Sequence, residues 1–222
     1  MKKISLYNHK GGVAKTTSVI NIAYFLQKSG KTVLVADCDS QKNAFGFFFE
    51  QGKNAVIQAT RYKNVSLTTW DKFADNSAIA NDFDYCLFDC PPAMTDEVKD
   101  IIRNSDSVFV PTILGEFEIA GLQDVTEEIR RQGSKLGGVF TTMYTKKNDD
   151  ELLKEFEQIL KGPLMKTIIP YSGTVRESQK AGLSLEEYFD EKKVPQNPGS
   201  RKVALSYEAL TLEILERSGE NV

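Results

Sequence analysis

Short apolar runs alternate along this chain with longer stretches in which apolar residues recur every three or four positions. The runs fall at residues 3–8, 32–36, 83–88, 107–111, 138–142 and 167–169. Continuous apolar runs of this kind are typical of strands that are buried on both faces of a parallel sheet. The helical spacing falls at residues 16–28, 96–104, 119–132, 149–160 and 203–217. The pattern therefore predicts strands that alternate with helices.

This alternation predicts an α/β fold: a doubly wound, mostly parallel sheet with helices on both faces. Right-handed crossovers place the carboxyl ends of the parallel strands along one edge, where we expect the functional site. With 222 residues and 41% hydrophobic content, the chain can bury one sizeable core, so we expect a single domain over residues 1–222. Residues 50–82 and 186–200 are polar and irregular, and we expect them to be variable loops.

The strongest chemical signal lies between the first predicted strand and the first predicted helix. The residues there are Lys10, Gly11, Gly12, Val13, Ala14, Lys15, Thr16 and Thr17. Small residues let backbone N–H groups converge on phosphate oxygens, and the start of a helix adds partial positive charge. In such a P-loop, Lys15 reaches the β- and γ-phosphates and the Thr16 hydroxyl binds Mg²⁺. Ala14 departs from the usual pattern, which has glycine directly before the lysine.

Two further segments place carboxylates at the ends of predicted strands. Asp37 and Asp39 follow the run at 32–36, and Asp89 follows the run at 83–88. A carboxylate at Asp39 can position a water molecule and accept its proton, while Asp37 would lie nearer the Mg²⁺ shell or hold the loop. Asp89 would hold Mg²⁺, and the two prolines after it would stiffen a switch segment at residues 90–97. Acids that merely cap the next helix are the structural alternative.

Together these motifs resemble those of the ParA/MinD family of ATPases, including its ParA/Soj-type partition proteins. The front lysine, Lys10, matches the second lysine of the family's deviant Walker A motif. The stretch from Asp37 to Gln41 resembles the family's DxDPQ, with Ser40 where proline is usual, and Asp89 begins a segment similar to its DxPP. The resemblance covers residues 1–49, 83–145 and 163–217.

The resemblance implies a role for each matched residue. Lys10 would reach across an ATP-sandwich homodimer to the partner's nucleotide, and Asp39 would orient the attacking water. Pro170 ends a TIIP stretch similar to the family loop that covers the adenine. Matched arginines bind DNA without sequence preference in partitioning members, which implies DNA contacts for a set of cationic residues. These are Arg176 and Arg201, with Lys180 and Lys202 beside them.

At the level of the whole protein, the resemblance implies an ATPase that uses ATP and Mg²⁺ and releases ADP and phosphate. It would be a switch for plasmid or chromosome partition: the ATP-bound dimer binds nonspecific DNA, and a ParB-like partner stimulates slow hydrolysis. An ATPase adaptor that positions a non-DNA cargo is the alternative, and the P-loop does not separate the two. The net charge of −3 gives no global basic field, so DNA binding requires a local patch, and solvated surface charge is the other interpretation of these cations.

The remaining composition bears on the cellular compartment. Cys38, Cys86 and Cys90 are odd in number and form no CxxC motif, so we expect core thiols in a reducing cytoplasm. No apolar run approaches the roughly 18 residues of a membrane span, and the acidic C-terminal segment is unlike a basic lipid-binding helix. We therefore expect a cytoplasmic protein, associated with the nucleoid when ATP-bound, that has no membrane contact.

Overall fold

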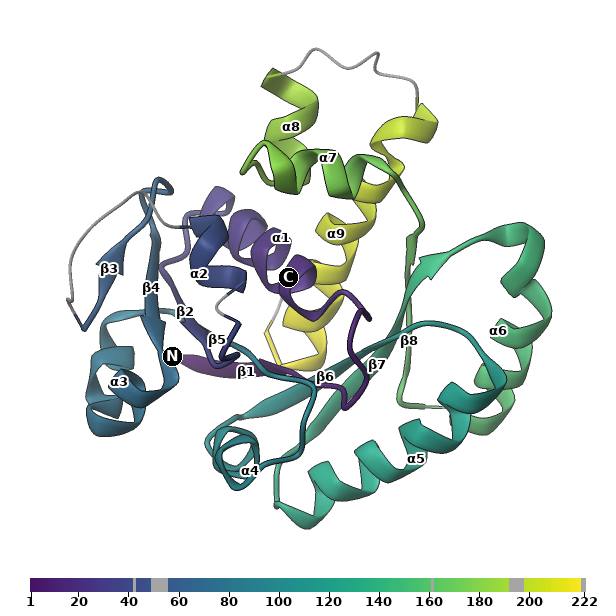
Figure 1. Cartoon of the computed structure of the whole chain (residues 1–222), viewed down its shortest axis with the longest axis horizontal. Coiled ribbons are helices and arrows are strands. Elements are labelled where there is room, and N and C mark those ends of the chain that lie inside the picture. The colour runs from purple at the N-terminus through teal and green to yellow at the C-terminus, as the bar shows by residue number, and fades with distance from the viewer. Residues whose placement is uncertain (42, 49–55, 161, 192–197, 221–222) are drawn as a thin grey trace.

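The protein folds around one twisted central sheet, as the computed structural model shows (Figure 1). The structure describes residues 1–41, 43–48, 56–160, 162–191 and 198–220. Within these ranges the sheet has eight strands in the order β3-β4-β2-β5-β1-β6-β7-β8. The strands are β1 (Lys2–Leu6), β2 (Val33–Asp37), β3 (Gln58–Ala59), β4 (Val65–Thr69), β5 (Tyr85–Asp89), β6 (Ser107–Thr112), β7 (Leu136–Tyr144) and β8 (Leu164–Pro170). Neighbouring strands are parallel except β3 and β4.

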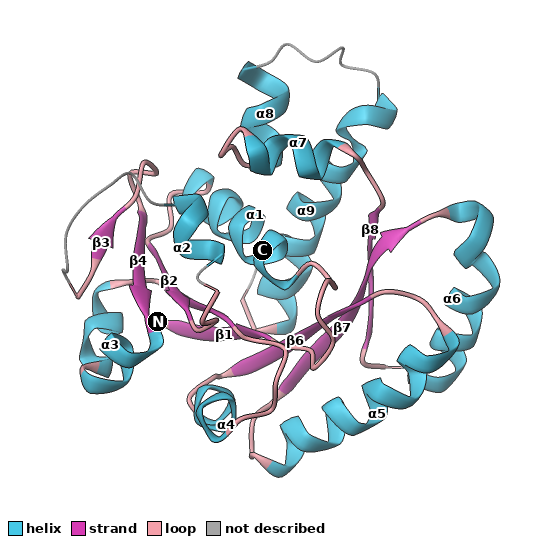
Figure 2. Ribbon diagram, viewed as in Figure 1, coloured by secondary structure: helices cyan, strands magenta, loops and turns pink. Residues whose placement is uncertain are grey.

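Helices cover both faces of the sheet (Figure 2). One face carries α1 (Lys15–Lys28) and α9 (Pro198–Arg217), which pack against each other. The opposite face carries α3 (Trp70–Asp75), α4 (Asp96–Arg103), α5 (Glu116–Arg131) and α6 (Lys146–Leu160). The shorter helices are α2 (Asn43–Phe48), the 3₁₀ helix η1 (Ser77–Asp82), α7 (Thr174–Lys180) and α8 (Leu185–Glu191). The predicted doubly wound, mostly parallel fold is confirmed.

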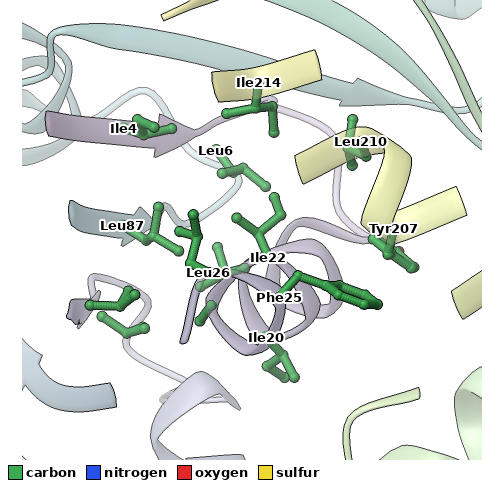
Figure 3. Packing of buried hydrophobic residues seen from close by; sticks show 14 of the residues in the cluster. Ile4, Leu6, Ile20, Ile22, Phe25, Leu26, Leu87, Tyr207, Leu210 and Ile214 are labelled. Atoms are coloured by element: carbon green, nitrogen blue, oxygen red, sulfur yellow. The ribbon is translucent and has the colours of Figure 1, made fainter. Parts of the chain in front are cut away.

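Two hydrophobic cores lie on opposite faces of the sheet because side chains alternate along each strand. In β2, Val33 and Val35 join the core under α1 and α9, whereas Leu34 and Ala36 join the core under the other helices. Figure 3 shows the first core, where α1 and α9 pack against β1 and β5. The chain therefore buries both faces of its central strands, as their continuous apolar runs predict.

The prediction of variable loops at residues 50–82 and 186–200 is wrong for most of the residues described there. β4 pairs in parallel with β2 along its whole length, and α3 and η1 follow it. The sequence VSLTT of β4 is too polar to be recognised as a buried strand. Thr68 is nevertheless buried, and its hydroxyl donates a hydrogen bond to the Val56 carbonyl at 2.8 Å. In the second segment, α8 continues to Glu191 and α9 begins at Pro198. Residues 50–55 and 192–197 lie outside the described residues.

The structure also bears on the predictions about cysteine and membrane. Cys38, Cys86 and Cys90 are free thiols and all three are buried, as expected of core residues. Burial raises the pKa of each thiol well above its usual range, which makes these cysteines poor nucleophiles. Over the described ranges, no helix combines the length and the apolar character needed to cross a bilayer.

Candidate functional site

The order of the strands places the loop after β1 at a topological switch point. From β1 the chain moves through α1 to β2 on one side of the sheet, whereas β6, the strand on the other side of β1, is reached from β5 through α4. Ligands in open α/β sheets bind outside the carboxyl ends of the strands at this position. The loop of residues 7–14 therefore occupies the place where a site is expected (Figure 1).

The backbone of this loop is shaped for close approach by a ligand. Gly12 has a φ of 76°, and a Cβ added to Gly11 or Gly12 would meet no atom within 4 Å, so the space beside both residues is open. Ala14 is the N-cap of α1 and has left-handed backbone angles, φ 66° and ψ 29°. Left-handed geometry costs a non-glycine residue about 1 kcal/mol. The alanine thus keeps the conformation that glycine normally supplies in a P-loop.

Lys15 lies on the inner side of this loop. Its ammonium donates hydrogen bonds to the carbonyl oxygens of Asn8, at 3.1 Å, and Lys10, at 2.9 Å. Burial lowers the pKa of Lys15, and the nearby charges of Asp89 and Asp39 act in the opposite direction. The side chain is therefore a buried cation at the start of α1, where a P-loop lysine reaches phosphate oxygens.

The acids at the ends of β2 and β5 lie side by side. Asp37 and Asp89 are register partners, and Asp89 is 1% exposed. Among the described residues, neither carboxylate oxygen of Asp89 forms a hydrogen bond of normal geometry, although the Thr16 hydroxyl and Lys15 lie near it. Burial raises the pKa of Asp89 to about 7, the Asp37 charge adds to the rise, and the Thr16 hydroxyl and Lys15 oppose it. The raised pKa shows that these two groups offset the carboxylate charge only in part, so the site is suited to a cation that compensates the rest.

These residues fit Mg²⁺ held jointly with phosphate oxygens. Over the described part of the chain, no three histidine, cysteine, aspartate or glutamate side chains converge as a metal site of protein ligands alone. Mg²⁺ does not need such a site, because it usually keeps several waters and binds through one or two carboxylates plus substrate phosphates. The Thr16 hydroxyl and the carboxylate oxygens of Asp89 are the ligands that this arrangement offers, with Asp37 beside them.

Two adjoining pockets open above the loop. The first, of about 290 Å³, is lined by Gly11, Gly12, Ala14, Lys15, Thr16, Thr17, Asp39, Asn43, Pro92 and Met143. The second, of about 440 Å³, includes Ile169, Pro170, Tyr171 and Tyr207 in its wall. Ala14, Thr17 and Met143 line both pockets, so the two adjoin. A small polar pocket next to a larger, more apolar one has the form that a nucleotide's phosphates and base require.

The structure brings together most of the residues predicted to bind nucleotide and metal. Asp39 lines the smaller of the two pockets, which we call the phosphate-sized pocket, and Pro170 lines the larger, the base-sized pocket. Asp89 lies beneath the loop. Val13 is buried, so it contributes its backbone and a core side chain. Lys10 does not point into either pocket: its ammonium forms an ion pair with Glu118, near the start of α5.

The residues predicted to contact DNA lie on α7 and at the start of α9. These two segments and α8 gather at one end of the molecule (Figure 1). Arg176, Lys180 and Lys202 are exposed, and Arg176 also lines the rim of the base-sized pocket. Arg201 is only 22% exposed, because its guanidinium forms ion pairs with Glu186 and Asp190 of α8. Arg201 therefore holds α8 against α9 in this structure.

Sequence reasoning missed several residues of the site. Met143 lines both pockets and has a left-handed φ of 55°. It directly follows the apolar run at residues 138–142, and this position could have predicted it, because the carboxyl ends of the strands line the site. Gln179 of α7 donates a hydrogen bond to the Thr17 hydroxyl at 2.9 Å, which links α7 to the P-loop. Glu118 lies 108 positions from Lys10, and no local pattern marks their contact.

A loop with a buried lysine at the switch point, two acids beside it and a pocket for a base together define a P-loop nucleotide-binding protein. Residues 4–185 match the family described as the CobQ/CobB/MinD/ParA nucleotide binding domain, and the chain belongs to this family. The resemblance to ParA/MinD proteins inferred from the motifs is thereby confirmed.

Similar proteins include partition ATPases. The chromosome-partitioning ATPase Soj of Treponema pallidum is 27% identical over 259 residues, and the alignment covers 99% of both chains. The sporulation initiation inhibitor protein Soj of Bacillus subtilis is 25% identical over 224 residues, with 82% of this chain and 88% of that protein covered.

Solved structures share the fold over nearly the whole chain. Apo McdA of Cyanothece has a TM-score of 0.77 at 18% identity, with 99% of this chain and 100% of that chain covered. The septum site-determining protein MinD of Pyrococcus horikoshii, in complex with Mg-ADP, has a TM-score of 0.78 at 19% identity, with 98% and 97% covered. A nucleotide and Mg²⁺ are thus bound by a protein of the same fold.

Proposed function

We propose that this chain is an ATP-hydrolysing switch that partitions DNA, and that residues 1–222 act as one domain. Two subunits that each hold ATP and Mg²⁺ associate through their P-loop edges, and the dimer binds nonspecific DNA. A ParB-like partner stimulates slow hydrolysis to ADP and phosphate, which separates the subunits. The ATP-bound dimer is therefore associated with the nucleoid, and the subunits released after hydrolysis are cytoplasmic.

The observation that carries this proposal is the difference in burial between the two lysines of one loop. Lys15 is 7% exposed and lies on the inner side of the loop, beside Asp39 and Asp89. Lys10 lies on the rim, where its side chain is 43% exposed. This difference in burial supports a role for Lys15 at the nucleotide of its own subunit and a role for Lys10 at a second subunit.

Each residue of the pocket has a chemical role in this proposal. Lys15 binds the β- and γ-phosphates, and the backbone N–H groups of Gly11 to Thr17 surround the phosphate oxygens. Mg²⁺, held by Thr16 and Asp89, supplies positive charge that offsets the charge of the phosphates. Asp39 lines the same pocket and is partly exposed, so its carboxylate can orient a water molecule towards the γ-phosphate.

The two lysines give the direct test. We expect Lys15→Ala to abolish ATP binding, because it removes the buried cation of the pocket. We expect Lys10→Ala to retain most ATP binding but to lose ATP-dependent dimerisation. Isothermal titration calorimetry measures the binding, and light scattering with ATP, ADP and no nucleotide measures the dimer. If Lys10→Ala dimerises with ATP and hydrolyses it at the wild-type rate, the cross-subunit role of Lys10 is wrong.

A second candidate function is an ATPase adaptor that positions a cargo other than DNA. It is favoured by the ion pairs of Arg201, which leave fewer uncommitted cations at the end of the molecule formed by α7, α8 and α9. The net charge of −3 points in the same direction. An electrophoretic shift of random duplex DNA separates the two candidates: if the wild-type ATP form leaves DNA unshifted at low salt, the adaptor is the better proposal.

A further inference from the structure

Lys10, the rim lysine of the P-loop, has an acidic partner in its own subunit. Its ammonium forms an ion pair and hydrogen bond with the carboxylate of Glu118, in the first turn of α5. The Glu118 side chain is only 11% exposed, in contrast to the 43% of Lys10. The carboxylate is therefore the more deeply placed of the two groups, and Lys10 supplies its positive charge.

The Glu118 side chain lies over Gly115 and borders a cavity beside the P-loop. A Cβ added to Gly115 would lie 2.9 Å from the Glu118 Cδ, so the carboxylate end of this flexible side chain lies directly over Gly115. The pair borders a cavity of about 220 Å³ that is lined by Asn8, His9, Lys10, Thr112, Phe117, Glu118, Gly121 and Leu122. Phe117 beside Glu118 is 91% exposed and the Lys10 side chain is 43% exposed, so the Lys10 end of the pair reaches the surface of the molecule.

We propose that Glu118 is a positioning residue that retains Lys10 within its own subunit and releases it only when a second subunit offers phosphate oxygens. This inference rests on the proposed role of Lys10 across the dimer. The same ammonium cannot pair with Glu118 and reach a nucleotide in another subunit at once, so the two contacts compete. Release leaves Glu118 as a mostly buried carboxylate without its cation, which opposes dimerisation.

The expected size of the effect follows from the exposure of the pair and from symmetry. A partly exposed ion pair at a surface changes an equilibrium by about threefold. A symmetric dimer uses the same surface of both subunits, so two Lys10–Glu118 pairs must open for each dimer formed. Removal of the Glu118 charge should therefore lower the dissociation constant of the ATP-bound dimer by about tenfold.

The experiment compares Glu118→Gln with Glu116→Gln in the chain of 222 residues. Glu116 lies in the same turn of α5, is exposed, and forms no ion pair within the described residues, so its variant removes the same charge without opening the contact. Dimerisation is measured by sedimentation velocity over a range of protein concentrations with a slowly hydrolysed ATP analogue and Mg²⁺. We expect Glu118→Gln to dimerise about tenfold more tightly than wild type and Glu116→Gln to match wild type.

The Lys10→Ala background shows whether Glu118 acts through Lys10. Lys10→Ala alone should bind the analogue without dimerising, and adding Glu118→Gln should not restore the dimer; a restored dimer would show that Glu118 acts independently of Lys10. Equal or weaker dimerisation of Glu118→Gln, in a variant that binds the analogue as wild type does, would overturn the proposal. If neither wild type nor Glu118→Gln dimerises at any concentration, the proposed dimer itself is wrong, whereas a normal wild-type dimer with an unchanged variant refutes only the role of Glu118.

Discussion

At the scale of single residues, the nucleotide site is built partly from backbone conformations that its side chains do not favour. Ala14 and Met143 both have a left-handed φ, and both line the two adjoining pockets. Strain of this kind costs about 1–3 kcal/mol per residue and persists only where the surrounding fold enforces it. At Ala14 the enforcing elements are β1 and α1, which fix both ends of the loop.

Ala14→Gly tests whether the loop is strained at this position. We expect the free energy of unfolding to rise by up to about 1 kcal/mol, because glycine adopts φ 66° without cost, although its greater freedom in the unfolded chain offsets part of the gain. Gly30→Ala is the control, since Gly30 has φ 80°, and it should lower the stability by about 1 kcal/mol. Urea unfolding measures both changes. A loss of stability in Ala14→Gly would contradict the interpretation.

Asp39→Ala tests the hydrolytic role that we propose for this carboxylate. The Asp39 Oδ1 accepts a hydrogen bond from the Gln41 N–H at 3.0 Å, which fixes the side chain at the edge of the phosphate-sized pocket. We expect the variant to bind ATP and to dimerise, but to hydrolyse at least about 100-fold more slowly, because water is no longer positioned. A phosphate-release assay measures this rate. Normal turnover would leave Asp39 as a structural cap of the loop.

At the scale of the elements, α9 completes an edge of the sheet. The Glu213 carboxylate accepts hydrogen bonds from the backbone N–H groups of Lys166 and Thr167 in β8, each at 2.9 Å, and pairs with Arg217 at 3.1 Å. β8 is an edge strand, whose unpaired N–H groups would otherwise be open to pairing with another chain. The helix thus closes the side of the sheet that borders the base-sized pocket, where β8 ends at Pro170.

Glu213→Gln should destabilise the protein in a pH-dependent way. Burial disfavours the ionised carboxylate, but the two N–H donors and Arg217 outweigh it and hold the Glu213 pKa below its ordinary value of 4.5. A lowered folded-state pKa contributes stability that is present above pH 4.5 and is lost as the pH falls through the folded-state value. We therefore expect Glu213→Gln to lower the free energy of unfolding by about 1–2 kcal/mol at pH 7, and this difference from wild type should shrink towards zero in acid.

The measurement is urea unfolding of Glu213→Gln and wild type between pH 7 and pH 3. Glu216→Gln is the matched control, because Glu216 is an exposed carboxylate on the same helix. If the two proteins differ in free energy of unfolding by the same amount at every pH in this range, the ionised form of Glu213 does not stabilise the fold more than the protonated form does.

At the scale of the whole molecule, the question is whether one end of the protein presents enough free positive charge to bind DNA. Glu186, which is buried, pairs with both Lys28 and Arg201, and Arg201 also pairs with Asp190. Charge reversal at Arg201 would therefore break the packing of α8 on α9 as well as any DNA contact. The exposed cations Arg176, Lys180 and Lys202 are cleaner probes of the proposed patch.

Arg176→Ala tests the patch through its salt dependence. Each phosphate contact contributes about 0.9 to the slope of log affinity against log salt, so loss of one contact per subunit should flatten the slope by about two units per dimer. Arg176→Glu should abolish the DNA shift while leaving ATP-dependent dimerisation intact. Arg130→Ala, an exposed arginine on α5, is the control and should leave the slope unchanged. An unchanged slope in Arg176→Ala would place any DNA contact elsewhere.

The sequence by itself determined the order of the main strands and helices, the class of the fold and the composition of the P-loop. These features depend on local patterns: buried parallel strands are continuous apolar runs, and phosphate loops need small residues between a strand and a helix. The acids at Asp37, Asp39 and Asp89 were found because each follows such a run, and the strands that they follow are neighbours in the sheet.

The tertiary structure alone decided where polar segments pack and which distant charges meet. β4 is buried because β2 pairs along it, although threonines dominate its end, and its sequence therefore gives no clear signal of a strand. Glu118 meets Lys10, and Arg201 meets Glu186, across sequence separations of 108 and 15 residues. Contacts of this kind depend on how α5, α8 and α9 are placed by the sheet and the cores. No local pattern encodes that placement, because the residues next to a charged side chain in the sequence do not indicate whether a distant residue will pair with it.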